Sequence, residues 1–272
     1  MAEQESRSPL FLNKEMDQPS VFRPDALIRE ARRQKGLSHT RAPDVCVLDP
    51  DGDILARLVS AGKARQWGDW PCYHSDLYAF RLRGREVGIV ACAVGAPFAV
   101  LVAEQLFALG CELLISITSA GQIAQTWPPP YFVLIERAMR DEGTSHHYLA
   151  PSLFVAADAD LITATSDALK EAGVGFHVGA TWTTDAPFRE TRRAIEAARV
   201  QGVLAVEMEA AALYALAQSC RRHVVCLAYV TNAMGQSGVD FEKGADGGAA
   251  DALRLLDAVI AGWRTSKERP PR

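Results

Sequence analysis

Short apolar stretches alternate with longer stretches of mixed polarity along most of this chain. The apolar ones are short enough for buried strands and are bounded by glycine and proline. They span residues 45–48, 87–94, 113–118, 131–135, 176–182, 203–206 and 224–230. Helical patterns lie between several of them, at residues 97–109, 158–172, 208–220 and 247–263. Strands that alternate with helices predict an α/β protein.

One further segment changes the expected sheet. Residues 76–82 have the pattern of an edge strand, which favours a mixed sheet over a purely parallel one. We therefore predict a three-layer α/β/α fold with a central mixed sheet. Residues 1–40 combine charge, proline and serine with few apolar positions, so we predict an N-terminal extension or arm there, a single α/β domain at 41–265 and a tail at 266–272.

Composition excludes several classes of partner. The 272 residues carry a formal net charge of -4 without a basic stripe, so nucleic acid and anionic membranes are not expected partners. The chain has no apolar run of membrane-spanning length and no apolar leader in its first 20 residues, which predicts a cytoplasmic protein. The six cysteines are scattered without zinc-ligand spacing, so we expect reduced thiols, no metal site and no cofactor.

The most specific segment for chemistry is Val-Glu-Met-Glu-Ala-Ala-Ala-Leu-Tyr at residues 206–214. It joins a predicted strand directly to an alanine-rich helix, with two carboxylates at the junction. Acids at a helix start can simply complement the helix dipole. However, this junction lies at the carboxyl end of a strand, where open α/β sheets bind ligands. We therefore place a candidate site at Glu207, Met208 and Glu209.

This segment resembles the Glu-Met-Glu signature of the nucleoside phosphorylase and nucleosidase family, which includes uridine phosphorylase, purine nucleoside phosphorylase and methylthioadenosine/S-adenosylhomocysteine nucleosidase. Four more segments resemble family motifs in the same order, at residues 94–97, 117–121, 141–148 and 181–189. Residues 141–148, Asp-Glu-Gly-Thr-Ser-His-His-Tyr, are similar to the uridine phosphorylase branch. The resemblance implies a nucleoside phosphorylase-like fold, cleavage of a nucleoside N-glycosidic bond, and a homodimer or a hexamer built from dimers.

The resemblance also implies roles for individual residues. Glu209 would hold the ribose hydroxyls, and Met208 would pack on the sugar. Asn232 stands where purine-specific relatives have an acid, which favours a base with a carbonyl group. Thr183 and Arg189 are candidate contacts for the edge of that base. Further candidate substrate-binding residues are Glu207, Ser119, Phe188, Gly95, Ser116 and His147.

The acceptor of the ribosyl group is where the chain departs from the phosphorylases. Three arginine positions that cradle phosphate in those enzymes correspond here to Asp53, to Ser116 and, by a looser alignment, to Tyr73 or His74. An acid in place of an arginine repels phosphate. We therefore predict hydrolysis, with Asp53 as the general base that activates water.

Three alternatives remain open at this stage. Asp53 could instead cap the helix predicted at residues 54–59. The enzyme could be a phosphate-dependent phosphorylase in which Arg57 or Arg65 binds phosphate. The chain could also be a nucleoside-binding protein that retains the pocket without turnover.

Overall fold

A computed structural model of the chain describes residues 8–234 and 243–268. Its strands are β1 (Val45–Asp49), β2 (Ala64–Gln66), β3 (Tyr78–Leu82), β4 (Arg85–Ala91), β5 (Leu113–Gln122), β6 (Tyr131–Asp141), β7 (Phe154–Ala156), β8 (His177–Thr184), β9 (Val203–Glu207) and β10 (His223–Asn232). Its α-helices are α1 (Pro24–Lys35), α2 (Asp53–Ser60), α3 (Ala96–Ala108), α4 (Ala159–Glu171), α5 (Arg192–Val200), α6 (Ala210–Cys220) and α7 (Ala249–Glu268). Short 3-10 helices are η1 (Pro9–Phe11), η2 (Thr144–His147), η3 (Pro187–Arg189) and η4 (Ala245–Gly248).

The strands form one mixed sheet in the order β10-β6-β8-β9-β5-β1-β4-β3-β2. β10 also pairs with β5, so five of these strands close into a ring. β1 lies parallel to β4 and β5, and β10 lies parallel to β5. β9 and β3 are antiparallel to their neighbours β5 and β4. The parallel neighbours β1, β5 and β10 therefore bring their carboxyl ends to one edge of the sheet, where the candidate residues lie.

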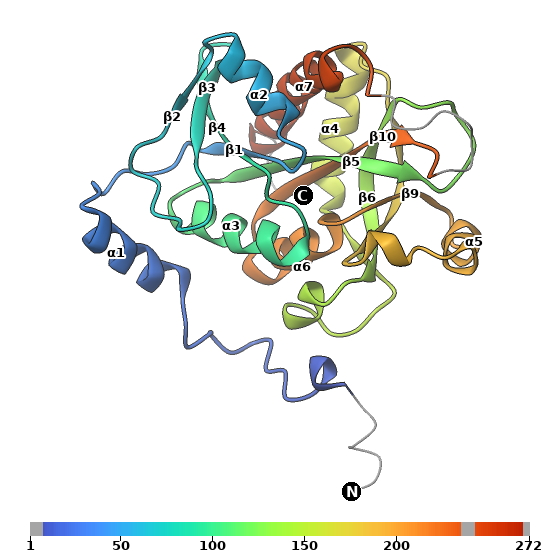
Figure 1. The fold of residues 1–272 in the computed structure, drawn as a ribbon, viewed down its shortest axis with the longest axis horizontal. Coiled ribbons are helices and arrows are strands. Elements are labelled where there is room, and N and C mark those ends of the chain that lie inside the picture. Colours follow the sequence, from blue (N-terminus) through green and yellow to red (C-terminus); the bar gives the residue numbers. More distant parts are fainter. Residues whose placement is uncertain (1–7, 235–242, 269–272) are drawn as a thin grey trace, which may run out of the picture.

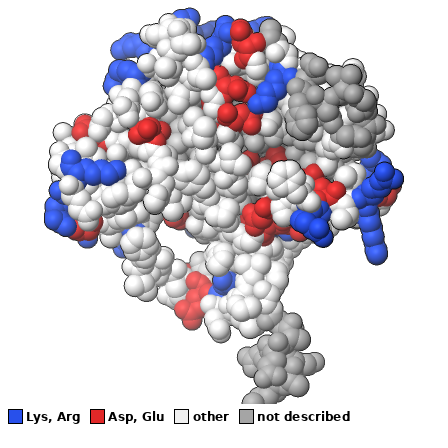
Figure 2. Space-filling view, viewed as in Figure 1, with Lys and Arg blue, Asp and Glu red and all other residues white. Residues whose placement is uncertain are grey.

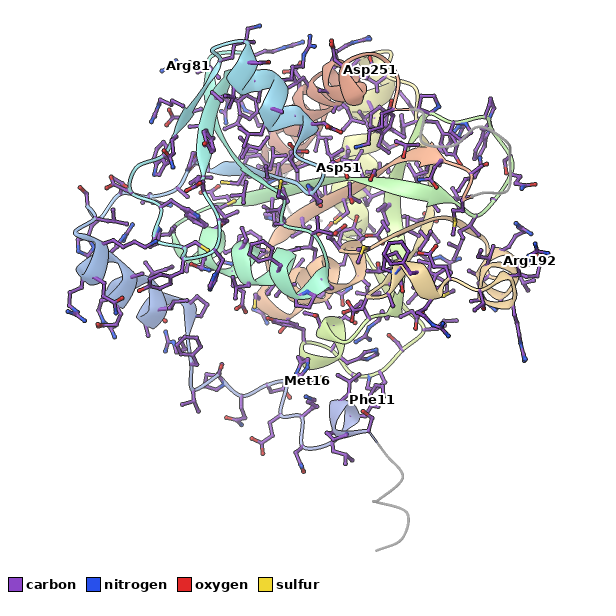
Figure 3. The ribbon with its side chains drawn as sticks, in the orientation of Figure 1. Phe11, Met16, Asp51, Arg81, Arg192 and Asp251 are labelled. Carbon is purple, nitrogen blue, oxygen red and sulfur yellow. The ribbon has the colours of Figure 1, made fainter. Side chains whose placement is uncertain are left out.

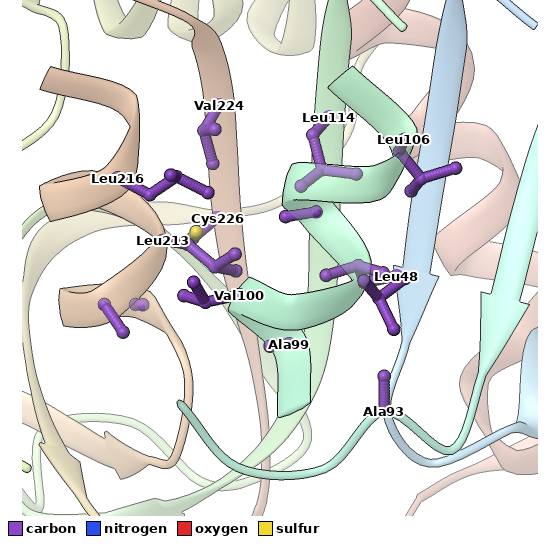
Figure 4. Packing of buried hydrophobic residues seen from close by; sticks show 14 of the residues in the cluster. Leu48, Ala93, Ala99, Val100, Leu106, Leu114, Leu213, Leu216, Val224 and Cys226 are labelled. Atoms are coloured by element: carbon purple, nitrogen blue, oxygen red, sulfur yellow. The ribbon is translucent and has the colours of Figure 1, made fainter. Parts of the chain in front are cut away.

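Helices cover both faces of the sheet (Figure 1). α3 and α6 pack on one face, and α2, α4 and α7 pack on the other. In Figure 4, Val100 and Leu106 of α3 and Leu213 and Leu216 of α6 lie against strand residues that include Leu114. This burial of aliphatic side chains on both faces supplies most of the favourable free energy of folding. The predicted three-layer α/β/α fold with a central mixed sheet is confirmed.

The predicted elements differ from the observed ones mainly at their ends. β5 continues to Gln122 and β6 continues to Asp141, beyond the apolar stretches that predicted them. Their last residues are polar but stay in the sheet, because β5 pairs with β9 and β6 pairs with β8 past the apolar core. α6 begins at Ala210 rather than at residue 208, since Glu209 has non-helical backbone angles. The short strands β2 and β7 and the helix α5 carry too few buried residues to be predicted from apolar pattern alone.

The predicted arm contains a helix. α1 lies within residues 1–40 and packs on α3 through the buried residues Ile28 and Ala31. Before α1, the segment that begins with η1 contacts η2: the Phe11 ring lies edge-on to the His146 ring, 5.0 Å away, and Lys14 lies 2.9 Å from His147. The chain then crosses to α1 along the lower side of the molecule in Figure 1. Among the described residues, no helix combines the length and the hydropathy needed to span a membrane.

The close packing of α7 on α4 yields a first prediction. A Cβ at Gly262 of α7 would lie 2.6 Å from the carbonyl oxygen of Ala164 in α4. We expect Gly262→Ala to lower the free energy of unfolding by about 1–2 kcal/mol, because overpacking strain exceeds the gain in helix propensity. Urea unfolding measures this change. The matched control is Gly175→Ala, where a Cβ meets nothing within 4 Å; an equal loss in both variants would contradict the packing argument.

Candidate active site

The junction between β9 and α6 is held together by Glu207. This carboxyl group is 3% exposed, and its Oε1 accepts hydrogen bonds from the hydroxyls of Thr181 at 3.1 Å and Thr183 at 2.5 Å. Its Oε2 accepts from the backbone N–H groups of Glu209 and Ala210, both at 2.7 Å. Four hydrogen bonds fill the accepting capacity of a carboxylate. Glu207 therefore caps α6 and joins it to β8, and it has no acceptor left for a substrate.

Glu209 has a different environment. It is 1% exposed, and its Oε1 accepts from the backbone N–H of Gly95 at 2.7 Å. Its Oε2 has no hydrogen-bond partner in the described part of the chain. Burial, and then the neighbouring charge of Glu207, raise the pKa of Glu209 to about 8, although the Gly95 N–H and the Thr118 hydroxyl favour its charged form. One buried carboxylate oxygen of Glu209 is thus left without a donor among the described residues.

The loop that reaches Glu209 depends on glycine. Gly95 precedes α3 and has a φ of 86°, a conformation that side-chain-bearing residues rarely adopt. This conformation directs its N–H to Glu209. The predicted pair of Gly95 and Glu209 is therefore brought together by the fold.

A cavity of about 440 Å³ opens beside this junction. It lies between the ends of β5, β9 and β10 and the segment that follows β8. The residues in its lining that bear on function are Ser119, Phe188, Glu190, Met208 and Asn232. Its volume falls in the range of small-molecule sites. Four of the predicted site residues, Ser119, Phe188, Met208 and Asn232, thus share one cavity, whereas Glu209 is buried and is not among the residues that line it.

The turn after β1 carries three acids with three different partners. Asp49 accepts from the backbone N–H groups of Gly52 at 3.2 Å and Leu55 at 2.9 Å, so it is the residue that caps α2. Burial raises the pKa of Asp49 to about 6. Asp53, considered as the cap from the sequence, therefore does not cap α2.

Asp51 is the acid that contacts the cavity wall. Its carboxylate accepts from the backbone N–H of Ser119 at 3.1 Å and from the Ser119 hydroxyl at 2.8 Å. Asp53 instead pairs with Lys243 at 2.6 Å, and Lys243 lies 3.5 Å from Asp51. Figure 3 labels Asp51 beside β5, and Figure 2 shows acidic and basic side chains gathered on the side where α2 and α7 lie. Among the three acids of this turn, Asp51, two residues before the predicted general base Asp53, is therefore the one that contacts a residue of the cavity lining.

Other predicted residues do not reach this cavity. The Thr183 hydroxyl bonds to Glu207 and accepts from the Ala211 N–H, so it is occupied inside the fold. Arg189 is exposed, and Ser116 is 1% exposed within β5. His147 lines a separate cavity of about 560 Å³ and lies 2.9 Å from Lys14. The geometry gives these four residues no contact with the cavity beside Met208.

The two arginines considered for phosphate are engaged elsewhere. Arg57 pairs with Asp246 of η4, which precedes α7. Arg65 pairs with Glu86 at 2.6 Å, on the β2–β4 side of the sheet. Tyr73 donates its hydroxyl to Gln34 of α1. None of the three is among the residues that line the cavity.

Glu190 is a cavity residue that the motifs in the sequence did not indicate. This residue directly follows η3, lines the cavity and is partly buried, and burial raises its pKa to about 7. Its position immediately after the segment 181–189 was the only signal in the sequence. It adds an ionisable side chain to a lining that otherwise holds the polar side chains of Ser119 and Asn232.

The fold and the cavity define a three-layer α/β protein with a nucleoside-sized site at the carboxyl edge of its sheet. The model of the phosphorylase superfamily matches residues 20–261. The chain therefore belongs to the phosphorylase superfamily, and it is an enzyme of the nucleoside phosphorylase class.

Individual relatives agree with this assignment. The chain is 29% identical to a uridine phosphorylase of Thermococcus kodakarensis over 207 residues, which cover 70% of this chain and 72% of that protein. It is 27% identical to a guanosine phosphorylase of Halorubrum lacusprofundi, covering 50% of this chain and 56% of the relative. A DeoD-type purine nucleoside phosphorylase of Hahella chejuensis is 31% identical, covering 57% of this chain and 66% of the relative.

A solved structure has the same fold. The uridine phosphorylase of Vibrio fischeri ES114, complexed with 6-hydroxy-1-naphthoic acid, superposes with a TM-score of 0.64 at 18% identity. The match covers 85% of this chain and 93% of that one. At this identity the similarity establishes the fold.

Proposed function

We propose that this enzyme cleaves the N-glycosidic bond of a nucleoside, releases the free base and transfers the ribosyl group to water. The bond between the anomeric carbon and the base nitrogen breaks with its electron pair leaving on the base. A water oxygen bonds to the anomeric carbon, and the water gives its proton to a carboxylate. Glu209 holds the sugar hydroxyls through its unpaired Oε2, and Met208 packs on the sugar.

The observation that carries the choice of water is the contact between Asp51 and Ser119. The Ser119 N–H and hydroxyl are anion-binding donors at the end of β5, and the Asp51 carboxylate occupies both. A phosphate dianion would have to displace this carboxylate and would also meet Asp53. Asp51 is therefore proposed as the general base, in place of Asp53.

Thr118 and Ser119 connect the two acids of the proposed mechanism. The Thr118 hydroxyl favours the charged form of Glu209, and the next residue binds Asp51. Adjacent side chains of a strand point to opposite faces. The sugar-binding acid and the water-activating acid are thus proposed to act from two sides of the end of β5.

Phosphorolysis is the second candidate, because the three relatives named above are phosphorylases. Lys243 would then have to leave its two aspartates and bind phosphate. The deciding experiment incubates the protein with uridine, inosine, guanosine and adenosine at zero and at millimolar phosphate. Free ribose at zero phosphate supports hydrolysis. Strict phosphate dependence with stoichiometric ribose 1-phosphate would overturn it.

Substitution of Asp51 tests the proposed general base directly. We expect Asp51→Asn to lower kcat about 100-fold with little change in KM, because removal of a general base affects the chemical step more than binding. The matched control is Asp53→Asn, two residues away, which should change kcat by less than about threefold. Steady-state kinetics on one cleaved nucleoside measure both. Equal losses in the two variants would contradict the assignment of Asp51 as the general base.

A further inference from the structure

The segment at residues 141–148 has no part in the proposed mechanism, and in the structure its 3-10 helix η2 contacts the chain before α1. Residues 8–23 are called the arm segment here. The Phe11 ring of this segment lies edge-on to the His146 ring, 5.0 Å away, and the Lys14 ammonium lies 2.9 Å from Nδ1 of His147. Two consecutive histidines thus form the surface on which the arm segment docks.

The contact with Lys14 fixes the protonation state of His147. An ammonium group only donates hydrogen bonds, so Nδ1 of His147 must accept, which requires a neutral ring with its proton on Nε2. A doubly protonated ring would place another N–H donor and another positive charge against Lys14. The contact therefore exists only while His147 is neutral.

His146 is held in the same neutral form from the side of the sheet. Its Nδ1 lies 3.2 Å from the guanidinium of Arg140, which also only donates. Arg140 is buried at the end of β6 and donates to the Ser145 hydroxyl at 2.8 Å as well. This network does not involve the arm segment. His146 is therefore a fixed, uncharged ring against which Phe11 packs, and His147 is the ring whose charge the arm segment meets.

The charges around His147 disfavour its protonation in the docked state. Partial burial, and then the charge of Lys14, lower the pKa of His147 below its ordinary value of 6.5, and the charge of Glu142 opposes them. Glu142 accepts a hydrogen bond from a backbone N–H of η2. Two further acids border the same cavity as His147, Glu104 and Asp185, and each accepts a hydrogen bond from another group. These three acids therefore already have hydrogen-bond donors of their own.

The arm segment borders one cavity at both of its ends. This is the cavity of about 560 Å³, which is lined by His147 beside η2 and by Phe22 and Leu27 where the chain enters α1. Between these points the chain crosses along the lower side of the molecule in Figure 1. Docking of the arm segment on η2 therefore joins two walls of the cavity.

We propose that His147 is an acid-sensitive latch for the arm segment: the neutral ring binds Lys14 and keeps the segment docked on η2, and protonation of the ring releases it. The docked state binds fewer protons than the released one, so docking is at full strength above pH 6.5 and weakens as the pH falls below it. A released ring with the ordinary pKa of 6.5 increases the released fraction about tenfold between pH 7.5 and pH 5.5.

The test measures cleavage of the arm segment by thermolysin in the full-length protein. The cleavage rate reports the released fraction when opening and closing are faster than the cut. Mass spectrometry follows the cuts beside Phe11, and each rate is divided by that of a free peptide of residues 8–18 at the same pH. The normalised rate should rise about tenfold from pH 7.5 to pH 5.5. Cleavage within residues 24–268 should stay slow at both pH values.

His147→Gln is the deciding variant, because its amide oxygen accepts from Lys14 at every pH. The His147 side chain is exposed, so the substitution leaves the core intact. Its normalised rate should change less than about twofold over this pH range. His39→Gln, which replaces an exposed histidine between α1 and β1, is the matched control and should keep the tenfold rise. Lys14→Met removes the donor and should be cleaved rapidly at both pH values.

Three results would each overturn the latch. They are a wild-type rate that does not change with pH, an equal rise in His147→Gln, and an equal rise in cleavage within residues 24–268. None of these measurements uses a substrate, so their outcome is independent of the proposed function.

Discussion

Replacement of Glu209 by glutamine is expected to lower kcat/KM for base release about 1,000-fold, equivalent to about 4 kcal/mol of transition-state stabilisation. In the proposed mechanism the carboxylate contacts the sugar as positive charge develops on it, so its charge contributes more in the transition state than in the ground state. A neutral amide of the same shape keeps the packing and loses this charge. A variant that retains more than about a tenth of the wild-type kcat/KM would remove Glu209 from the mechanism.

The pH dependence of kcat/KM is a second test of the role of Glu209. Because the pKa of Glu209 lies at about 8, its carboxyl group is mostly protonated at neutral pH in the free protein. If the ionised form is active, kcat/KM rises as the pH passes through this pKa and levels off above it. The residual activity of Glu209→Gln should lack this rise. A wild-type profile that falls over this range would contradict the assignment.

The contribution of Glu209 to stability changes with pH in the direction opposite to that of the activity. The ordinary pKa of a glutamate is 4.5, so between pH 4.5 and about pH 8 the unfolded chain holds less of this proton than the folded one. The contribution of Glu209 to the free energy of unfolding therefore declines as the pH rises through this window. Glu209→Gln has no such proton to lose. The Tm of Glu209→Gln should rise relative to that of the wild type as the pH approaches 8. The same unfolding transition shows that the inactive variant is folded.

Replacement of Glu207 by alanine is expected to lower the free energy of unfolding by about 4 kcal/mol, among the largest effects of a single substitution. Two buried threonine hydroxyls and the N–H groups of Glu209 and Ala210 would lose their acceptor. Each unsatisfied buried donor costs about 1–3 kcal/mol, partly offset by relief of the buried charge. Urea unfolding followed by circular dichroism measures the loss.

The matched control for Glu207 is an exposed glutamate in an ion pair. Glu86→Ala breaks the pair with Arg65, whose side chain is 61% exposed, and should cost under about 1 kcal/mol. A loss of similar size in both variants would show that the hydrogen bonds of Glu207 are not structural. Glu207→Gln keeps the shape and should give an intermediate loss, because its amide N–H groups face N–H donors.

Glu207 and Glu209 show that a sequence motif can locate two side chains without distinguishing their functions. Sequence pattern placed both at the same strand-to-helix junction and could not distinguish them. Their partners do: four hydrogen bonds occupy Glu207, whereas one oxygen of Glu209 is without a partner among the described residues. The partners that distinguish them, Thr181 and Thr183 of β8 for Glu207 and Gly95 before α3 for Glu209, lie far away in the sequence.

The acceptor position illustrates a limit of alignment. The pattern Asp-Pro-Asp-Gly-Asp offers three acids within five residues. Which one caps α2, which contacts Ser119 and which meets Lys243 depends on the path of the turn, where Gly52 has a φ of 80°. No periodicity in the sequence encodes that path.

By itself, the sequence determined the three-layer α/β fold, the order of its main elements and the strand-to-helix junction at Glu207 and Glu209 where the site is proposed. Apolar periodicity is a local property, because each strand or helix must bury one face. Only the tertiary structure decided that Asp51 contacts Ser119, that Thr183 is used inside the fold and that Glu190 joins Asn232 in one cavity. These relations join segments separated by tens of residues, and a one-residue shift of a strand or turn would point a different side chain into the site.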